Sequence, residues 1–286
     1  MIDKIEKSSE IIDNFASQTE RLIDRIYQPQ IEAREYFVDA VKNNSTITDE
    51  EAIALISNSR KIVREYSNCK SILEKAKEHF FDKSEKNIDD VSVDCDWLNS
   101  FFDKARLISN EDMQIIWSRL LSKKMDNPNQ VNLSLLHTIS IMSTDQANFF
   151  CNMCRFCFHG YKNDIIHPLI FLSTNVVAYG DSGITNKKLR ELSRLGLIDY
   201  MPKEEFVIPK KFVFTTGNKV VAIYGDPNNK NQIRAGNVIF TDDGLDLYSI
   251  VEETVKKYRS DILDFTIEKF KNRNCTVTIN DKLVRY

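Results

Sequence analysis

The first 160 residues contain almost none of the residues that interrupt regular structure. All eight glycines lie at or after Gly160, and only two of the six prolines, Pro29 and Pro128, come before it. Glycine and proline are the strongest local markers of turns and loops. Their scarcity predicts long helices in residues 1–160 and a region of turns and strands in residues 161–286.

The sequence also has no long apolar run. The longest, residues 165–178, contains His167 and Pro168 and is too short to cross a bilayer of roughly 30 Å. The N-terminus is charged within its first few residues and lacks the apolar segment of a secretion signal. We therefore expect a cytoplasmic protein with no membrane span.

Cysteine is sparse, and the charge is nearly balanced. Three of the six cysteines crowd into residues 151–157, where mutual disulfides would be strained, so reduced thiols are expected. Residues 1–160 hold 20 basic and 26 acidic side chains, and residues 161–286 hold 19 and 16. This asymmetry is too mild to indicate a nucleic-acid-binding protein by itself.

Apolar residues at helical spacing begin in the first segment. The spacing predicts a helix that breaks at Pro29 and a second helix that resumes through Val41. Thr48 and Glu51 form a capping box, in which the hydroxyl and the carboxylate satisfy each other's backbone N–H groups. A long helix should follow, to about His79.

Aromatic residues mark the next helices. Trp97, Phe101 and Phe102 indicate one helix, and Ser109 is expected to cap another. That second helix has a single apolar stripe at helical spacing, formed by Met113, Ile116, Trp117, Leu120 and Leu121. A further capping box, Ser143 with Gln146, opens a helix in which cysteines recur.

The period changes in residues 161–286. A short helix over residues 187–195 should stop at Gly196, because glycine adopts the left-handed conformation that ends helices. Strands are predicted at 212–216 and 220–224 around a Gly217-Asn218 turn, with a third at 237–240. Thr241 to Gly244 should open one long helix through about Phe270, and residues 275–286 a last hairpin around Asn280-Asp281.

The order of these elements resembles a winged-helix domain. In such a domain a helix leads directly into the first strand of a β-hairpin wing, and another helix follows. We therefore predict a mainly α protein: a multi-helix domain at 1–160, then a small winged-helix-like α/β domain at 161–286 with a C-terminal helix and hairpin.

Three cysteines and a histidine form a tempting metal-ligand set. Cys151, Cys154, Cys157 and His159 carry the ligand types that zinc and iron–sulfur centres use. The same cysteines recur every third residue in an apolar segment, and buried cysteine behaves as a small hydrophobic residue. A packed helix face is more typical of this pattern, so no metal or other cofactor is expected.

Two other patterns have a catalytic alternative. Arg155 and His159, expected on one helix, resemble the arginine–histidine pair of helical prokaryotic ribonucleases, although their spacing is shorter. Asp94 and Asp96 are more typical of a helix cap than of a cation site. Phosphate-binding glycine loops and the common hydrolase and zinc motifs are missing from the sequence, so no catalytic residue is predicted.

A basic helix face offers a possible contact with DNA. Five polar residues line the outer side of the predicted 187–195 helix and its start: Asn186, Lys187, Lys188, Arg190 and Arg194. Such residues suit phosphate contacts, but a solvated helix face has the same composition.

Residues 96–128, DWLNSFFDKARLISNEDMQIIWSRLLSKKMDNP, resemble the bacterial family catalogued as domain of unknown function 2806. The matching positions include Trp97, Ser109-Asn110-Glu111, Gln114 and Trp117, and the resemblance extends over roughly residues 20–255. One departure is Pro128-Asn129-Gln130, where the family tends to have Pro-Gly-Ser. The family implies no catalytic residue.

The helix containing Ile116-Trp117-x-x-Leu120-Leu121 is also similar to the abortive-infection alpha family of phage-defence proteins. These resemblances imply a non-enzymatic interaction or sensor component of an anti-phage system, with a protein partner or a homo-oligomer. A DNA-binding regulator and a helical ribonuclease are the alternatives.

Overall fold

The computed structural model describes residues 2–43, 47–81, 94–127, 131–160, 168–171, 183–216, 219–226, 232–252, 255 and 260–281. It divides into two compact units, Met1–Ser140 and Ile141–Tyr286. The first unit is helical, and the second contains a small sheet of antiparallel strands, which confirms the predicted fold class.

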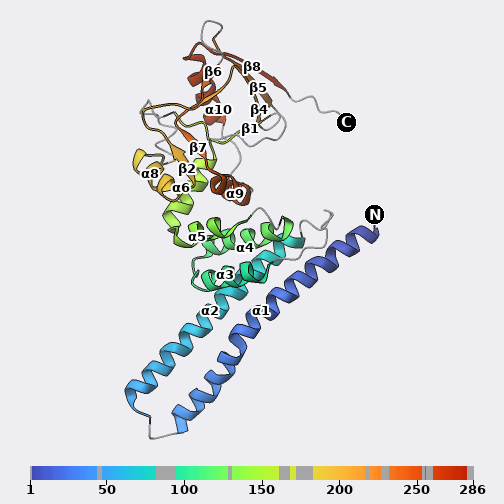
Figure 1. Ribbon diagram of the computed structural model, residues 1–286, viewed down its shortest axis with the longest axis vertical. Helices are drawn as coiled ribbons and strands as arrows, with labels where there is room; N and C mark the ends of the chain where they lie inside the picture. Colours follow the sequence, from blue (N-terminus) through green and yellow to red (C-terminus); the bar gives the residue numbers. More distant parts are fainter. Residues whose placement is uncertain are drawn as a thin grey trace. The chain divides into compact units, whose positions relative to one another are not determined.

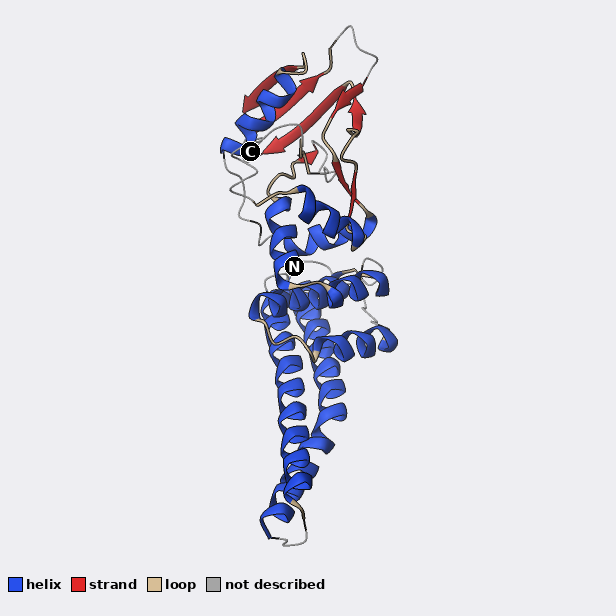
Figure 2. Ribbon diagram, turned by 90° about the vertical axis from the view of Figure 1, so that its left-hand side faces the viewer, coloured by secondary structure: helices blue, strands red, loops and turns tan. Residues whose placement is uncertain are grey.

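Two long antiparallel helices dominate the first unit. Helix α1 (Ile2–Asn43) and helix α2 (Asp49–Phe81) lie side by side in both views (Figures 1 and 2). The predicted break at Pro29 is wrong, because α1 continues through it. Pro29 is exposed, and the side-chain amide of Gln30 donates to the Ile26 carbonyl within the turn that Pro29 interrupts (2.8 Å).

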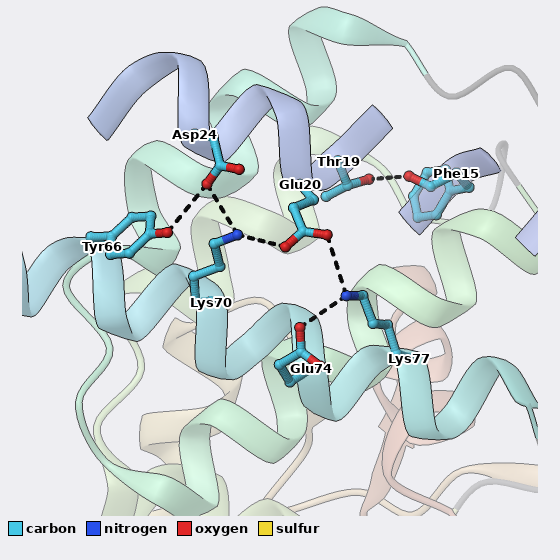
Figure 3. A network of polar contacts seen from close by, with 8 residues as sticks. All are labelled: Phe15, Thr19, Glu20, Asp24, Tyr66, Lys70, Glu74 and Lys77. Atoms are coloured by element: carbon cyan, nitrogen blue, oxygen red, sulfur yellow. Dashed lines mark hydrogen bonds and ion pairs between the residues drawn. The ribbon is translucent and has the colours of Figure 1, made fainter. Parts of the chain in front are cut away.

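A polar network joins the two helices near the middle of α1 (Figure 3). Lys70 of α2 contacts Glu20 at 2.7 Å and Asp24 at 3.0 Å, and the Tyr66 hydroxyl donates to Asp24 (3.3 Å). Lys77 contacts Glu20 at 3.6 Å. The hydrogen bond from Lys70 lowers the pKa of Glu20, so the Glu20 carboxylate is charged at neutral pH.

Three shorter helices follow in the first unit: α3 (Cys95–Ala105), α4 (Glu111–Asp126) and α5 (Leu133–Ile141). Helices α3 and α4 contribute the aromatic residues of its core. The Phe101 ring stands between the two tryptophans, 5.2 Å from the Trp97 ring and 5.1 Å from the Trp117 ring. All three side chains are buried, which agrees with the apolar spacing in the sequence.

Local capping chemistry sets most helix starts. The Thr48–Glu51 capping box is confirmed, as is the box formed by Ser143 and Gln146. The predicted cap at Ser109 is wrong by one residue: the Asn110 side chain accepts from the Met113 amide (3.1 Å) and caps α4. Ser109 instead accepts a hydrogen bond from Asn68 (3.2 Å).

The second unit begins with α6 (Thr144–Cys154), which packs against helices of this unit. The sequence had predicted this helix as part of the first domain. Helix α8 (Asn186–Arg194) ends before Gly196, whose φ is +75°, and strand β2 (Ile198–Tyr200) follows. Strand β2 pairs with β7 (Val238–Phe240), which leads into helix α9 (Asp242–Val251).

The predicted hairpin forms the centre of a sheet with strand order β1-β4-β5-β8 (labelled in Figure 1). Strands β4 (Lys211–Thr216) and β5 (Lys219–Tyr224) pair antiparallel, with Thr216 opposite Lys219, and the predicted Gly217-Asn218 turn lies outside the described residues. Strands β1 (His159–Gly160) and β8 (Thr276–Asp281) lie on either side. Strands β3 (Val207–Pro209) and β6 (Gln232–Arg234) form a separate pair.

Two predictions for the last part of the chain are wrong. The single long helix from residue 241 is two helices, α9 and α10 (Ser260–Lys271), with Glu252 capping the end of α9. Asn280 and Asp281 do not form a turn; they lie in β8, opposite Val220 and Lys219 of β5. The edge of β5 that faces away from β4 provides hydrogen-bond partners for the backbone of β8. A local turn signal does not reveal such distant partners.

None of the helices in the described ranges is long and apolar enough to cross a membrane.

Candidate functional site

The predicted DNA-binding residues share one exposed helix. Lys187, Lys188, Arg190 and Arg194 are all exposed on α8, and Thr185 caps the helix start. Asn186 accepts a hydrogen bond from the Tyr200 hydroxyl (2.8 Å). The Lys188 ammonium lies 5.3 Å from the centre of the Phe149 ring, so part of this basic face is held by contacts within its own unit.

The spacing of Arg155 and His159 predicted that they lie on one helix, but they do not share a helix. Helix α6 ends at Cys154, Arg155 is its C-cap, and His159 lies in strand β1 opposite Thr215. Phe156 and Phe158 follow the helix, and both are buried. Residues two positions apart point the same way in an extended chain but to different faces of a helix, so burying both favours ending the helix before them. The spacing argument for a ribonuclease pair is therefore wrong.

The three clustered cysteines are only partly on a helix face. Cys151 and Cys154 belong to α6, and Cys157 follows the helix. Cys154 is buried, whereas Cys151 and Cys157 are half-buried. Burial, with a smaller contribution from the neighbouring Cys157 thiol, raises the pKa of Cys154 well above its ordinary value. This thiol is neutral and unreactive at physiological pH.

Asp94 acts as a helix cap. Its carboxylate accepts from the backbone N–H of Asp96 (2.9 Å) at the start of α3, as the sequence indicated. Within the described residues, no group of three or more His, Cys, Asp or Glu side chains is arranged to hold a metal ion.

A surface that the sequence analysis did not identify lies on the first half of α2. It forms a groove of about 710 Å³ lined by residues from a single helix face, here called the α2 face: Ile53, Ile56, Ser57, Arg60, Lys61 and Arg64. Ile53 is 67% exposed and Ile56 is 42% exposed. The face therefore combines accessible apolar side chains with three cations.

The α2 face belongs to a part of the α1–α2 pair whose described side chains are mostly exposed. We call residues 28–43 of α1 and 49–64 of α2 the arm. Among the arm side chains that the structure describes, not one is buried, and Tyr36 is 76% exposed. Burial begins beyond the arm, with Tyr27 on α1 and Glu65 on α2. Helix pairs gain most of their stability from packing an apolar face, and the described side chains of this arm bury little apolar surface.

Charge is unevenly distributed along the arm half of α2. Its first turn carries Asp49, Glu50 and Glu51, and its cations follow at residues 60, 61 and 64. Backbone and side-chain hydrogen bonds from Thr48 lower the pKa of Glu51, which therefore stays ionised. The acidic residues also suit the positive end of the helix dipole.

A signal for this surface was present in the sequence. Ala52, Leu55 and Ile62 follow helical spacing and are half-buried, which accounts for one packed stripe. Ile53 and Ile56 fall outside that stripe and form a second apolar row that the fold of the unit leaves exposed. Two apolar rows on one half of a helix indicate either a buried helix or a binding surface.

The fold is thus a helical unit with a long arm and a second unit with a small antiparallel sheet. The family described as protein of unknown function (DUF2806) matches residues 58–262, and the chain belongs to this family. This confirms the resemblance seen in the sequence. No curated protein and no solved structure matches the chain.

Proposed function

We propose that this protein is a non-enzymatic interaction component of a bacterial anti-phage system, and that it acts through contacts made by its arm. The observation that supports this proposal is the exposure of Ile53 and Ile56 on an arm whose described side chains are all at least partly exposed. Contiguous exposed apolar residues with polar neighbours are typical of protein interaction sites. Single exposed residues, such as Leu107, need no such explanation.

The defence context comes from the likeness of the Ile116-Trp117-x-x-Leu120-Leu121 segment to abortive-infection proteins. In this structure Trp117, Leu120 and Leu121 are fully buried, so the segment supports the fold and does not form a surface. The likeness is therefore an analogy between folds, and function has to be tested at a site.

A phage-plating assay tests the proposal. The gene, expressed with its native neighbours, should lower phage plating, and Ile53→Lys with Ile56→Lys should abolish that protection. Leu107→Lys is the matched control, because Leu107 is 61% exposed in the same unit but lies outside the arm. Protection that survives the double substitution, at equal protein level and helical content, would contradict the proposal.

A DNA-binding regulator is the second candidate, and the exposed basic face of α8 favours it. The order of α8, β2, β7 and α9 is compatible with a winged-helix interpretation in which β2 leads into the wing and β7 leads out of it. If the interpretation holds, affinity for duplex DNA should fall steeply with salt, because phosphate contacts release counterions. Lys187→Glu with Lys188→Glu should weaken binding, and no binding even at low salt would exclude this candidate.

A further inference from the structure

The arm half of α2 carries charges of opposite sign at its two ends, with apolar residues between them. Asp49 and Arg64 mark the ends of one stripe that also contains Ile53, Ile56 and Arg60. These residues are spaced by three or four positions, which places them on one side of the helix over about 22 Å. All five are exposed.

We propose that the α2 face binds the α2 face of a second copy of this chain, with the two helices antiparallel. The inference rests on the proposed function, because it names the partner of the arm. A two-fold axis between Ile56 and Ser57 relates the copies, so the same residues are used on both sides, as in most homodimers.

This register pairs complementary side chains along the whole stripe. Asp49 of each copy lies opposite Arg64 of the other, which creates two equivalent ion pairs. Ile53 lies opposite Arg60, whose aliphatic stem can cover the isoleucine while its guanidinium stays in water. At the centre, Ile56 lies opposite Ser57, a small side chain that allows the helices to approach closely.

Antiparallel pairing also suits the rest of the unit. The axis lies within the arm, so each copy's α3 and α4, which lie beside α2 after the arm, point to opposite ends of the helix pair. The two helix dipoles run in opposite directions, and each acidic first turn meets the basic segment of the other copy.

A second copy accounts for more of the surface than an acidic partner does. An acidic protein or a nucleic acid would use Arg60 and Arg64, but it would be repelled by Asp49 at the other end of the same stripe and by the acidic first turn around it. Only a partner with charges in the reverse order satisfies both ends. The same stripe on a second, antiparallel copy of the chain presents its charges in that order.

Sedimentation velocity on the full chain tests the inference, from about 1 to about 300 micromolar and at low and high salt. The wild type should show a concentration-dependent monomer–dimer equilibrium, weaker at high salt because exposed ion pairs are screened. Ile53→Lys with Ile56→Lys should remain monomeric, because each new ammonium at position 53 would face Arg60 of the other copy, and Leu107→Lys should behave as the wild type.

Charge reversal tests the register. Asp49→Arg alone and Arg64→Asp alone each replace two attractive contacts by two repulsive ones, and each should weaken association by about tenfold. The combined variant Asp49→Arg/Arg64→Asp restores both contacts and should recover most of the affinity. Circular dichroism checks that each variant keeps its helices.

A wild type that stays monomeric over this range would overturn the inference, and so would a combined variant no better than the single ones. Loss of phage protection in the isoleucine variant together with a monomeric wild type would support the proposed function but refute the second copy as its partner. A dimer that dissociates as expected without any loss of protection would refute the proposed function and support this inference.

Discussion

Replacing Trp117 tests the core that positions α2. Trp117 is fully buried on α4, and its ring lies 5.1 Å from the Phe101 ring. Trp117→Ala removes the indole from this contact and leaves a cavity, because α3 and α4 are held by further buried aromatic residues and can collapse only in part. Such truncations cost about 3–5 kcal/mol of unfolding free energy.

Trp117→Phe provides the graded comparison. Phenylalanine keeps one ring in the site, and it also removes a buried indole N–H that has no acceptor among the described residues. Burying a donor without a partner is unfavourable, so part of the lost packing is offset. We expect a cost of about 1–2 kcal/mol for this variant, clearly below that of alanine.

Urea denaturation followed by tryptophan fluorescence measures both values. The chain has two tryptophans, and both are buried in the first unit, so in either variant Trp97 still reports unfolding of that unit. With a denaturant slope near 2 kcal/mol per molar, Trp117→Ala should lower the midpoint by about 2 M. An unchanged midpoint for alanine, or an equal loss for both variants, would refute the assigned packing of α4.

Three further predictions concern other parts of the chain. Gly244→Ala should destabilise the second unit by about 2–3 kcal/mol in a thermal melt, because a Cβ there would lie 1.9 Å from the Leu197 carbonyl oxygen; an unchanged melt would contradict that close approach. Burial raises the pKa of the Cys69 thiol to about 12, whereas the thiol of the unfolded chain ionises near pH 8.5. The contribution of this group to the unfolding free energy is therefore complete below about pH 8.5, and it is lost as the pH rises towards 12. Cys69→Ala should therefore reduce the alkaline loss of stability, and an identical pH profile would contradict this. Elemental analysis of protein purified without added metal should find no zinc or iron, and one zinc per chain would show that Cys151 to Cys157 bind metal after all.

Local signals predicted the helical elements well because capping and apolar spacing act over a few residues. The Thr48–Glu51 box, the α4 stripe and the stop at Gly196 all depend on neighbouring residues, and the structure has all three. Pro29 misled because an exposed proline can be tolerated within a long helix when its neighbours remain packed. The extra strands β1, β3 and β6 are only two or three residues long and pair over long sequence distances, which a local pattern does not encode.

The candidate site was harder to predict than the fold. Residue type and spacing drew attention to Arg155 and His159, but whether two residues share a helix depends on where that helix ends, and buried Phe156 and Phe158 lie beyond the end of α6. Conversely, Ile53 and Ile56 look like ordinary core residues in the sequence. Only the structure shows that the chain leaves them uncovered.

Comparative phage plating tests the central claim, that the protein acts through contacts of its arm and not through chemistry of its own. One variant is Arg155→Ala with His159→Ala and the other is Ile53→Lys with Ile56→Lys, each expressed with the native neighbouring genes and checked for folding. We predict that the first variant protects as well as the wild type and that the second does not protect. Loss of protection in the Arg155/His159 variant, with full protection by the arm variant, would contradict the account.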